Sequence, residues 1–317
     1  MTQRWPKLDY EADRPVIESL HAYLQVLGKL PTRAAPWCNH SWHLALRVVP
    51  RGFRSYPVEM DGGEAEIIFD CLSSAVAVET STGFADGFEV TGQSVARFHE
   101  QFSELLSLAG VTTDVSGAPN EVETAVPFHE DTEERAWDEA TLARIQRAFS
   151  DANRVFERFR TGFVGKSSPS HLFWGSFDLA VTRFSGREAP LHPGGFPNLP
   201  DRVTREAYSH EVSSAGFWLG GGGVEEAAFY AYGYPTPEGF AEATIEPDAA
   251  YWLEDLGEFV LPYEAVRSSA DPEGALMKFL ESTYAAVADA GGWAREAFEI
   301  PRGKYGEPYD VEAHREG

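Results

Sequence analysis

The chain has 317 residues, of which 43% are hydrophobic and 13% are aromatic, so it can fill a core of ordinary size. Its 50 acidic residues outnumber its 26 basic residues and give a formal net charge of −24. This charge repels both a phosphate backbone and an anionic membrane surface, which disfavours nucleic acid and membranes as partners. A strongly solvated surface explains the acidity more simply than a dedicated basic partner does.

The cysteines and the N-terminal segment bear on where the protein works. Cys38 and Cys71 are too few for a disulfide framework, and they lack the paired spacing of a zinc knuckle. No segment has the pattern of a signal peptide or of a membrane span. The sequence therefore predicts a cytoplasmic protein with a small-molecule substrate or ligand, and it leaves the oligomeric state open.

Hydrophobic periodicity predicts the elements of the first half. A helix is expected from about residue 14 to Gly28, since apolar residues recur there at spacings of three and four. A strand through Trp42 and strands at 65–69 and 75–79 are expected next, followed by a helix over 94–108. Residues 112–138 are rich in Pro, Gly, Thr and acidic residues without periodicity, which predicts a connection.

The second half repeats this order. The same reasoning predicts a long helix over 138–163, a strand over 177–184 and a Gly/Pro loop over 186–200. Three further strands are expected at 208–217, 228–234 and 257–261, and a last helix is expected at 272–289. The chain is thus divided into a first α+β half (1–115), a linker (116–137), a second α+β half (138–300) and a C-terminal tail (301–317).

Two short segments match each other across the halves. Residues 41–47 (SWHLALR) and 176–182 (SFDLAVT) carry serine, aromatic, polar, leucine, alanine and aliphatic residues in the same order. The match predicts an α+β fold made of a tandem pseudo-twofold repeat of helix–strands–helix units, with mixed or antiparallel sheets. A cleft between the halves is the expected place for a pocket, with His43 and Asp178 at equivalent strand positions.

The leading functional hypothesis is a metal-dependent enzyme acting on a small organic substrate in this cleft. His43, Asp178 and His210 are the predicted ligands of a divalent iron, zinc or manganese ion, and His171 and Glu211 are the predicted catalytic residues, as a base or a further ligand. Oxidation and hydrolysis both stay open. The alternative for each histidine is a buried, hydrogen-bonded structural role.

A non-catalytic protein that binds a small organic acid is the second hypothesis. Arg47 and Arg183 have guanidinium groups that match a carboxylate, and Tyr232 shares a strand face with Tyr230 and Tyr234, where it could line a pocket. Surface ion pairs and an aromatic core are the structural alternatives for these residues. Metal content of the purified protein distinguishes the two hypotheses.

Three longer runs resemble a known family. They are residues 5–15 (WPKLDYEADRP), 171–187 (HLFWGSFDLAVTRFSGR) and 205–218 (REAYSHEVSSAGFW). They are similar to a bacterial domain-of-unknown-function group, number 5996, and the similarity spans nearly the whole chain. The resemblance implies a bacterial setting, and it implies no activity, cofactor or catalytic residue.

Overall fold

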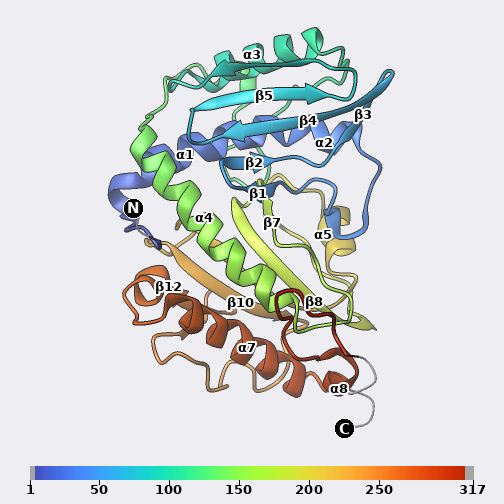
Figure 1. The fold of residues 1–317 in the computed structure, drawn as a ribbon, viewed down its shortest axis with the longest axis vertical. Helices are drawn as coiled ribbons and strands as arrows, with labels where there is room; N and C mark the ends of the chain where they lie inside the picture. Colours follow the sequence, from blue (N-terminus) through green and yellow to red (C-terminus); the bar gives the residue numbers. More distant parts are fainter. Residues whose placement is uncertain (1–3, 311–317) are drawn as a thin grey trace.

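The chain folds into an α+β architecture with two antiparallel sheets and flanking helices (Figure 1). The computed structural model describes residues 4–310. The first sheet contains β1 (Arg47–Val49), β2 (Gly52–Arg54), β3 (Val58–Met60), β4 (Gly63–Asp70), β5 (Ala75–Thr80) and β6 (Ala85–Glu89). The second contains β7 (His171–Phe173), β8 (Asp178–Glu188), β9 (His210–Trp218), β10 (Ala228–Tyr234), β11 (Tyr251–Leu253) and β12 (Glu258–Pro262). The helices are α1 (Tyr10–Leu27), α2 (Lys29–Ala34), α3 (Val95–Leu108), α4 (Glu139–Arg160), α5 (Asp201–Ala207), α6 (Tyr263–Arg267), α7 (Pro272–Ala290) and α8 (Arg295–Phe298), with 3-10 turns η1 (Asn39–Ser41) and η2 (Phe128–Glu130).

Both sheets are antiparallel, which is one of the two arrangements that the sequence left open. The first has the order β1-β2-β4-β5-β6, with β3 paired to β4, and the second has the order β11-β12-β10-β9-β8-β7. The two sheets meet edge to edge at one bridge, where Leu46 and Leu172 each donate a backbone hydrogen bond of 2.8 Å to the other. Because both leucines are buried, this bridge places the seam between the sheets inside the core.

The long amphipathic helices and the central strands lie close to their predicted positions. The first helix is an exception, because it begins at Tyr10 instead of near residue 14. The Asp9 carboxylate caps it by accepting a backbone N–H of the first turn, and Pro15 lies inside it. Gly28 has φ −61°, so it is not a left-handed cap. A Cβ there would lie 2.1 Å from the Trp174 ring, so close approach of the indole requires the glycine.

The predicted strand through Trp42 is wrong. Residues 39–41 form η1, and His40 and Ser41 adopt left-handed φ values of 58° and 59°. Trp42 follows in a turn, and β1 begins only at Arg47. The alternation of side chains expected for a strand therefore does not apply to this segment.

The matched segments consequently differ in conformation. Asp178 is the first residue of β8, whereas His43, which the sequence match aligns with it, lies in a turn. Helix, antiparallel strands and helix do recur in that order, from α1 to α3 and from α4 to α7. The coarse architecture is thus as predicted, and the pseudo-twofold relation between the halves is not confirmed.

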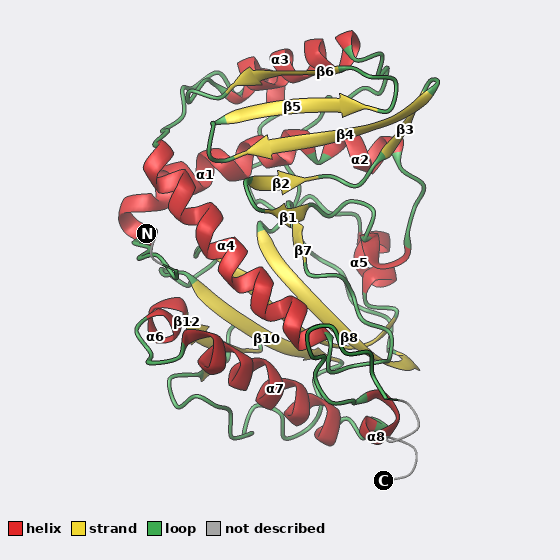
Figure 2. Ribbon diagram, viewed as in Figure 1, coloured by secondary structure: helices red, strands yellow, loops and turns green. Residues whose placement is uncertain are grey.

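Helices cover one face of the second sheet. Figure 2 shows α4 and α7 lying across the front of β8 and β10. Phe149 and Phe156 of α4 contact Phe217 and Phe229 of the sheet, with ring centroids 5.2 and 6.4 Å apart. The opposite face has a small apolar cluster of its own, formed by Val224, Ala228 and Val260. The residues of each strand therefore divide between a helix-covered face and a far face.

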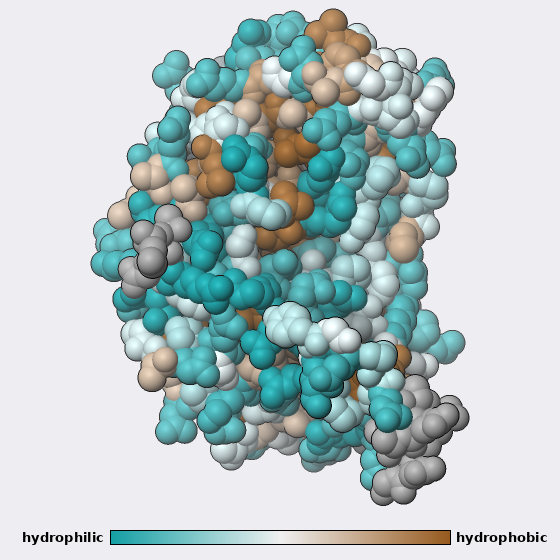
Figure 3. Space-filling model, viewed as in Figure 1, coloured by the Kyte–Doolittle hydropathy of each residue, from teal (hydrophilic) through white to brown (hydrophobic). Residues whose placement is uncertain are grey.

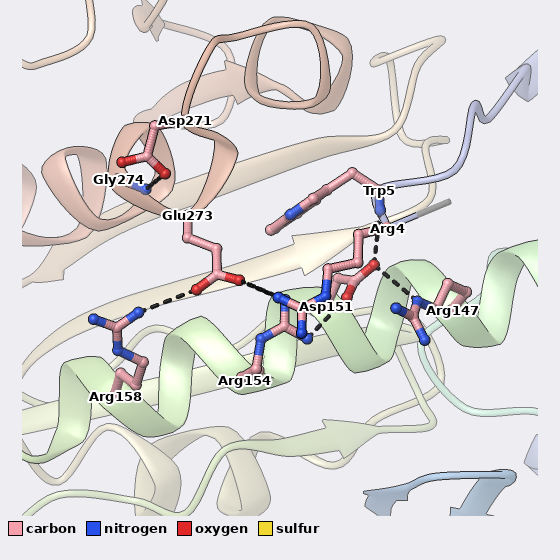
Figure 4. A network of polar contacts seen from close by, with 9 residues as sticks. All are labelled: Arg4, Trp5, Arg147, Asp151, Arg154, Arg158, Asp271, Glu273 and Gly274. Carbon is pink, nitrogen blue, oxygen red and sulfur yellow. Dashed lines mark hydrogen bonds and ion pairs between the residues drawn. The ribbon is translucent and has the colours of Figure 1, made fainter. Parts of the chain in front are cut away.

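An ion-pair network ties the N-terminal segment to α4 and α7 (Figure 4). The Asp151 carboxylate is fully buried and accepts hydrogen bonds from the Trp5 backbone N–H at 2.8 Å, Arg154 at 2.9 Å and Arg147 at 3.2 Å. Arg154 also donates to Glu273 of α7 at 2.8 Å. Every oxygen of the buried carboxylate is thus paired, which is the condition for tolerating such a charge.

The surface agrees with the composition. The face in Figure 3 is mostly hydrophilic, and apolar atoms are a minor part of it, chiefly in the upper half. Within residues 4–310, no helix combines the length and the apolar character that crossing a bilayer requires.

Candidate functional site

The structure does not bring together His43, Asp178 and His210, the predicted metal ligands. Asp178 pairs with Trp218 at one end of the β8–β9 ladder, and His210 pairs with Glu188 at the other end. His210 and Trp218 are the two ends of β9, and a strand rises by about 3.3 Å per residue. The backbone of Asp178, which lies beside Trp218, is therefore about 26 Å from the backbone of His210. Ligand bonds to a metal are about 2.0–2.2 Å long, so one ion cannot contact both side chains.

His43, the third predicted ligand, contacts residues of its own segment. Its Nδ1 accepts the backbone N–H of Cys38 at 3.2 Å, and its ring lies 4.9 Å from that of Trp37. Burial lowers the pKa of His43, and its Nε2 is buried without a partner. Across residues 4–310, no group of three or more His, Cys, Asp or Glu side chains could hold a metal ion. The predicted metal site is therefore not assembled, because a turn replaces the strand that was expected to place His43 beside Asp178.

The two predicted catalytic residues serve other contacts. His171 is 1% exposed beside Trp42 and Phe173, and burial lowers its pKa to about 3. A pKa this low makes His171 a weak base, and its ring is shielded from water, so it does not suit the role of a general base. Glu211 accepts hydrogen bonds from Arg187 at 2.7 Å and from Ser185 at 2.8 Å. Its carboxylate is thus committed to an ion pair that holds the end of β8.

The three residues predicted to bind an organic acid do not face one ligand. Arg47 pairs with Glu66 of the first sheet and donates to the backbone oxygen of Ser55. Arg183 lies on the helix-covered face of the second sheet, where its guanidinium carbon is 3.6 Å from the ring centroid of Phe159. Tyr232 belongs to the far face. A shared site for these three residues is therefore not formed.

His40 anchors η1 to α5 instead of joining a catalytic set. Its Nδ1 lies 2.8 Å from the Ala207 carbonyl oxygen, and Lys166 Nζ lies 2.6 Å from its Nε2. Its backbone N–H donates to the Glu206 carboxylate at 2.9 Å. Burial lowers the pKa of His40, so a neutral ring that donates from Nδ1 and accepts at Nε2 satisfies all of these contacts.

The far face of the second sheet does gather groups that can do chemistry. We call five of them the tyrosine–carboxyl cluster: Asp178, Tyr208, Tyr230, Tyr232 and Glu258. This face is turned away from the viewer in Figure 2, since α4 and α7 cover the near one. The Tyr230 hydroxyl donates to Asp178, and the hydroxyls of Tyr208 and Tyr232 are 2.7 Å apart. The rings of Tyr230 and Tyr232 are stacked, with centroids 6.0 Å apart and planes 15° apart.

The backbone explains why these side chains meet. Tyr230 and Tyr232 lie two residues apart on β10 and therefore share a face, as the sequence predicted. Tyr232 is paired with Ser214 of β9, and Tyr230 is paired with Gly216. Since Gly216 has no side chain, the Tyr230 ring lies across β9 and reaches Asp178 on β8. A Cβ at Gly216 would be 2.2 Å from the ring.

Both carboxyls of the cluster have raised pKa values. Burial, with a smaller contribution from the charge of Glu121, raises the pKa of Asp178 to about 7 against the hydrogen bond from Tyr230. Burial and the charge of Asp178 raise the pKa of Glu258 to about 8. Burial raises the pKa of Tyr232 to about 12. The two carboxyls therefore change protonation near neutral pH, which is a frequent property of functional sites.

These two carboxyls also lack a basic partner. Asp13 pairs with Arg144 at 2.6 Å, and Asp151 and Glu211 pair with arginines in the same way. Among residues 4–310, neither Asp178 nor Glu258 forms an ion pair, and no basic group is a cause of either pKa shift. A buried carboxylate normally has a paired cation, so these two carboxyls lack a compensating positive charge.

Two further aromatic side chains pack against the tyrosines of the cluster. Trp218 lies 5.1 Å from Tyr230 between ring centroids. His192, from the loop between β8 and α5, stacks on Tyr208 with centroids 4.8 Å apart. The backbone N–H of Glu121 donates to the Pro197 oxygen, which fixes that loop to the connection between the halves. The loop between β8 and α5, which the sequence predicted to be irregular, therefore lies against the cluster through His192.

Replacing Gly216 by alanine should disrupt the Tyr230–Asp178 contact. The methyl group must displace the ring, which should lower the free energy of unfolding by about 1–3 kcal/mol. Loss of the hydrogen bond should also move the pKa of Asp178 further up, since that bond holds it down. Urea denaturation and an NMR pH titration of the carboxyl carbons measure the two effects.

The matched background for this variant is Tyr230→Ala. With no ring to displace, the alanine at position 216 should add little further cost, so the two substitutions should be clearly non-additive. Additive costs would show that the ring does not lie over Gly216.

Sequence reasoning missed two members of the cluster. Glu258 lies in the strand sequence EFVLP, and a single carboxyl in an otherwise apolar strand was the available signal. Tyr208 was assigned to a strand, but it is the C-cap residue that directly follows α5. Only its place in three dimensions shows that it reaches Tyr232.

Comparison with known proteins identifies the family of this chain and gives no information about its site residues. The model of a "Family of unknown function (DUF5996)" matches residues 5–300, which confirms the resemblance seen in the sequence. The match covers most of the chain, so the protein belongs to this family. Neither a curated protein nor a solved structure matches it.

Proposed function

We propose that this member of the DUF5996 family binds a small organic cation in the tyrosine–carboxyl cluster, with Asp178 and Glu258 as its counter-ions. One observation carries the proposal: two desolvated carboxyls without a basic partner lie on one sheet face with three tyrosines. An ammonium group would supply the charge that the site lacks.

The aromatic rings support a cationic ligand in particular. A cation over the face of a tyrosine or tryptophan ring is attracted by the ring quadrupole, most strongly where water is excluded. The stacked pair Tyr230 and Tyr232 and the neighbouring Trp218 present such faces. Carboxyls beside aromatic faces are a combination that favours ammonium groups over anions.

The charge of the whole chain has the same sign as the site. A formal net charge of −24 attracts cations and repels anions over the surface, and it raises the local concentration of a cationic ligand. The acidity that excluded nucleic acid thus supports this class of ligand.

The carboxyls are also suited to exchanging protons with the ligand. Groups with pKa values near 7 and 8 can donate or accept a proton at neutral pH. The catalytic form of the proposal is therefore proton transfer between a bound amine-containing substrate and Asp178 or Glu258. It uses no metal ligand, since His43 and His210 lie outside the cluster.

Three predictions from the sequence stay predictions beside this one. They are the pseudo-twofold relation between the halves, the cytoplasmic location and the bacterial setting. The repeated order of helix, antiparallel strands and helix supports the first.

Isothermal titration calorimetry with choline tests the proposal. We expect a dissociation constant of about 0.1–1 mM, and binding should tighten as the pH rises from about 6 to 9, because the ligand favours ionised carboxyls. Titrations in two buffers of different ionisation enthalpy should show that protons are released at pH 7. Asp178→Asn and Glu258→Gln should each weaken binding about tenfold or more.

Two controls locate the binding. The exposed Asp255→Asn should leave affinity unchanged, and the neutral isostere 3,3-dimethylbutan-1-ol should not bind. Tyr232→Phe, which keeps the ring face, should bind far better than Tyr232→Ala. Equal binding of choline to the wild type and to both amide variants would refute the proposal.

A further inference from the structure

A second unpaired charge lies on the other face of the same strand. A cavity of about 420 Å³ opens beside Arg183, between the end of α7 and the segment around α8. Its volume is in the range of small-molecule sites. Its charged and polar lining includes Arg183, Glu246, Lys278, Glu281, Tyr284, Arg295, Glu299 and Arg302.

Arg183 is held by aromatic rings, not by a carboxylate. It is 4% exposed, and its guanidinium carbon lies 3.6 Å from the ring centroid of Phe159, 4.4 Å from that of Tyr284 and 4.9 Å from that of Phe163. One Nη donates to the Phe159 carbonyl oxygen at 2.6 Å. The rings fix the plane of the guanidinium, but they do not neutralise its charge.

Two buried polar atoms at this cavity make no close hydrogen bond, although the hydroxyl among them lies near Arg183 and Glu299. They are the Nε of Arg183 and the hydroxyl of Tyr284. Buried donors are nearly always hydrogen-bonded in native proteins, so two such atoms together indicate a missing acceptor. Both belong to residues that line the cavity.

The other charged residues that line the cavity form ion pairs in which Arg183 takes no part. Each carboxylate of the lining has another partner: Glu246 pairs with Lys278 at 3.4 Å, Glu281 with Arg302 at 3.4 Å and Glu299 with Arg295 at 2.6 Å. In the described part of the chain, Arg183 is the one cation of this lining that forms no ion pair. Arg295 also pairs with Asp289. Glu281 and Glu299 lie close enough to favour the charge of Arg183 without forming an ion pair with it, so an anion in the cavity would supply Arg183 with a direct partner.

We infer that this cavity binds a small monocarboxylate, whose two oxygens accept from the Arg183 guanidinium and the Tyr284 hydroxyl. Arginine presents planar N–H donors that match a carboxylate, and such charge-assisted bonds are about twice as strong as neutral ones. Ala285 and Ile300 of the lining offer apolar contacts to the rest of the ligand. This site is separate from the tyrosine–carboxyl cluster, because Arg183 points to the helix-covered face.

Titration of the full-length protein with acetate, butyrate and benzoate tests the site. Butyrate should bind with a dissociation constant of about 1 mM or tighter, whereas its neutral amide, butyramide, should not bind in the same range. Tyr284→Phe should weaken binding about five- to tenfold, and Arg183→Lys about a hundredfold. Heteronuclear NMR on protein labelled at the arginine side chains should show the Arg183 Nε resonance moving on addition of butyrate.

Matched variants separate this site from the rest of the molecule. Arg267→Lys, on α6 and paired with Glu264, should leave butyrate affinity unchanged. Asp178→Asn should also leave it unchanged, so the choline site and the carboxylate site fail independently. Tyr284→Phe only removes a hydroxyl, so it keeps the test decisive if Arg183→Lys does not fold. Absence of butyrate binding at about 10 mM, or binding that Tyr284→Phe does not alter, would overturn the inference.

Discussion

Replacing Asp151 by alanine is expected to lower the free energy of unfolding by about 3–5 kcal/mol. The carboxylate is fully buried, and its removal leaves the Trp5 backbone N–H, Arg147 and Arg154 without their acceptor (Figure 4). These groups cannot regain water without opening the contact between the N-terminal segment and α4. Urea denaturation followed by circular dichroism measures the loss.

The matched control is Glu18→Ala on α1. Glu18 and Arg14 form a solvent-exposed pair at 3.8 Å, with side chains that are 66% and 56% exposed. Such pairs contribute about 0–0.5 kcal/mol, so this variant should be nearly as stable as the wild type. Equal losses in the two variants would show that the Asp151 network does not hold the fold together.

The amphipathic elements could be predicted because a single local pattern determines each of them. Phe149 and Phe156 on α4, and the alternating residues of β4, show their buried faces by spacing alone. The segment around Trp42 has the same alternation of apolar and polar residues, yet it turns. Its conformation depends on contacts of His40 with Glu206 and Ala207, which are distant in sequence.

The candidate site was predictable only in part, for a related reason. The spacing of Tyr230 and Tyr232 placed them on one face, and Asp178 was named as a site residue. Its partners were wrong, because a strand match between the halves cannot show how far apart two strand ends lie. Glu258 comes from a strand that is two positions away from β9 in the sheet, and only the sheet order brings it near Asp178.

Arg183 shows the limit of residue type as evidence. The sequence suggested Arg183 as an arginine that could hold an organic acid, which stays a prediction, and it grouped Arg183 with Tyr232. Residues 183 and 182 of β8 point to opposite faces, so Arg183 and the tyrosines lie on different faces of the sheet. Side chains alternate between the two faces of a sheet, and following this alternation across β8, β9 and β10 together would have separated Arg183 from Tyr232.

The double variant Asp178→Asn/Glu258→Gln should be more stable than the wild type at pH 9. The folded protein raises the two carboxyl pKa values from 3.8 to about 7 and from 4.5 to about 8, so it keeps protons that the unfolded chain releases. Wild-type stability should therefore fall as the pH rises from about 4 to 8 and then level off. One pKa unit corresponds to about 1.36 kcal/mol, so two shifts of about three units each set an upper bound of roughly 9 kcal/mol on the difference at pH 9, and solvent around these half-buried carboxyls reduces it to several kcal/mol.

The amides remove this penalty because they carry no charge at any pH. The asparagine can still accept the Tyr230 hydroxyl at its side-chain oxygen, so the packing of the cluster is retained. Urea denaturation at pH 4 and pH 9 measures the effect: the two proteins should be similar at pH 4 and should diverge above it. Parallel stability profiles would show that Asp178 and Glu258 ionise at ordinary pH values and need no cation. The divergence that we expect means instead that keeping two carboxyls unpaired costs the fold stability, as the proposed cation site requires.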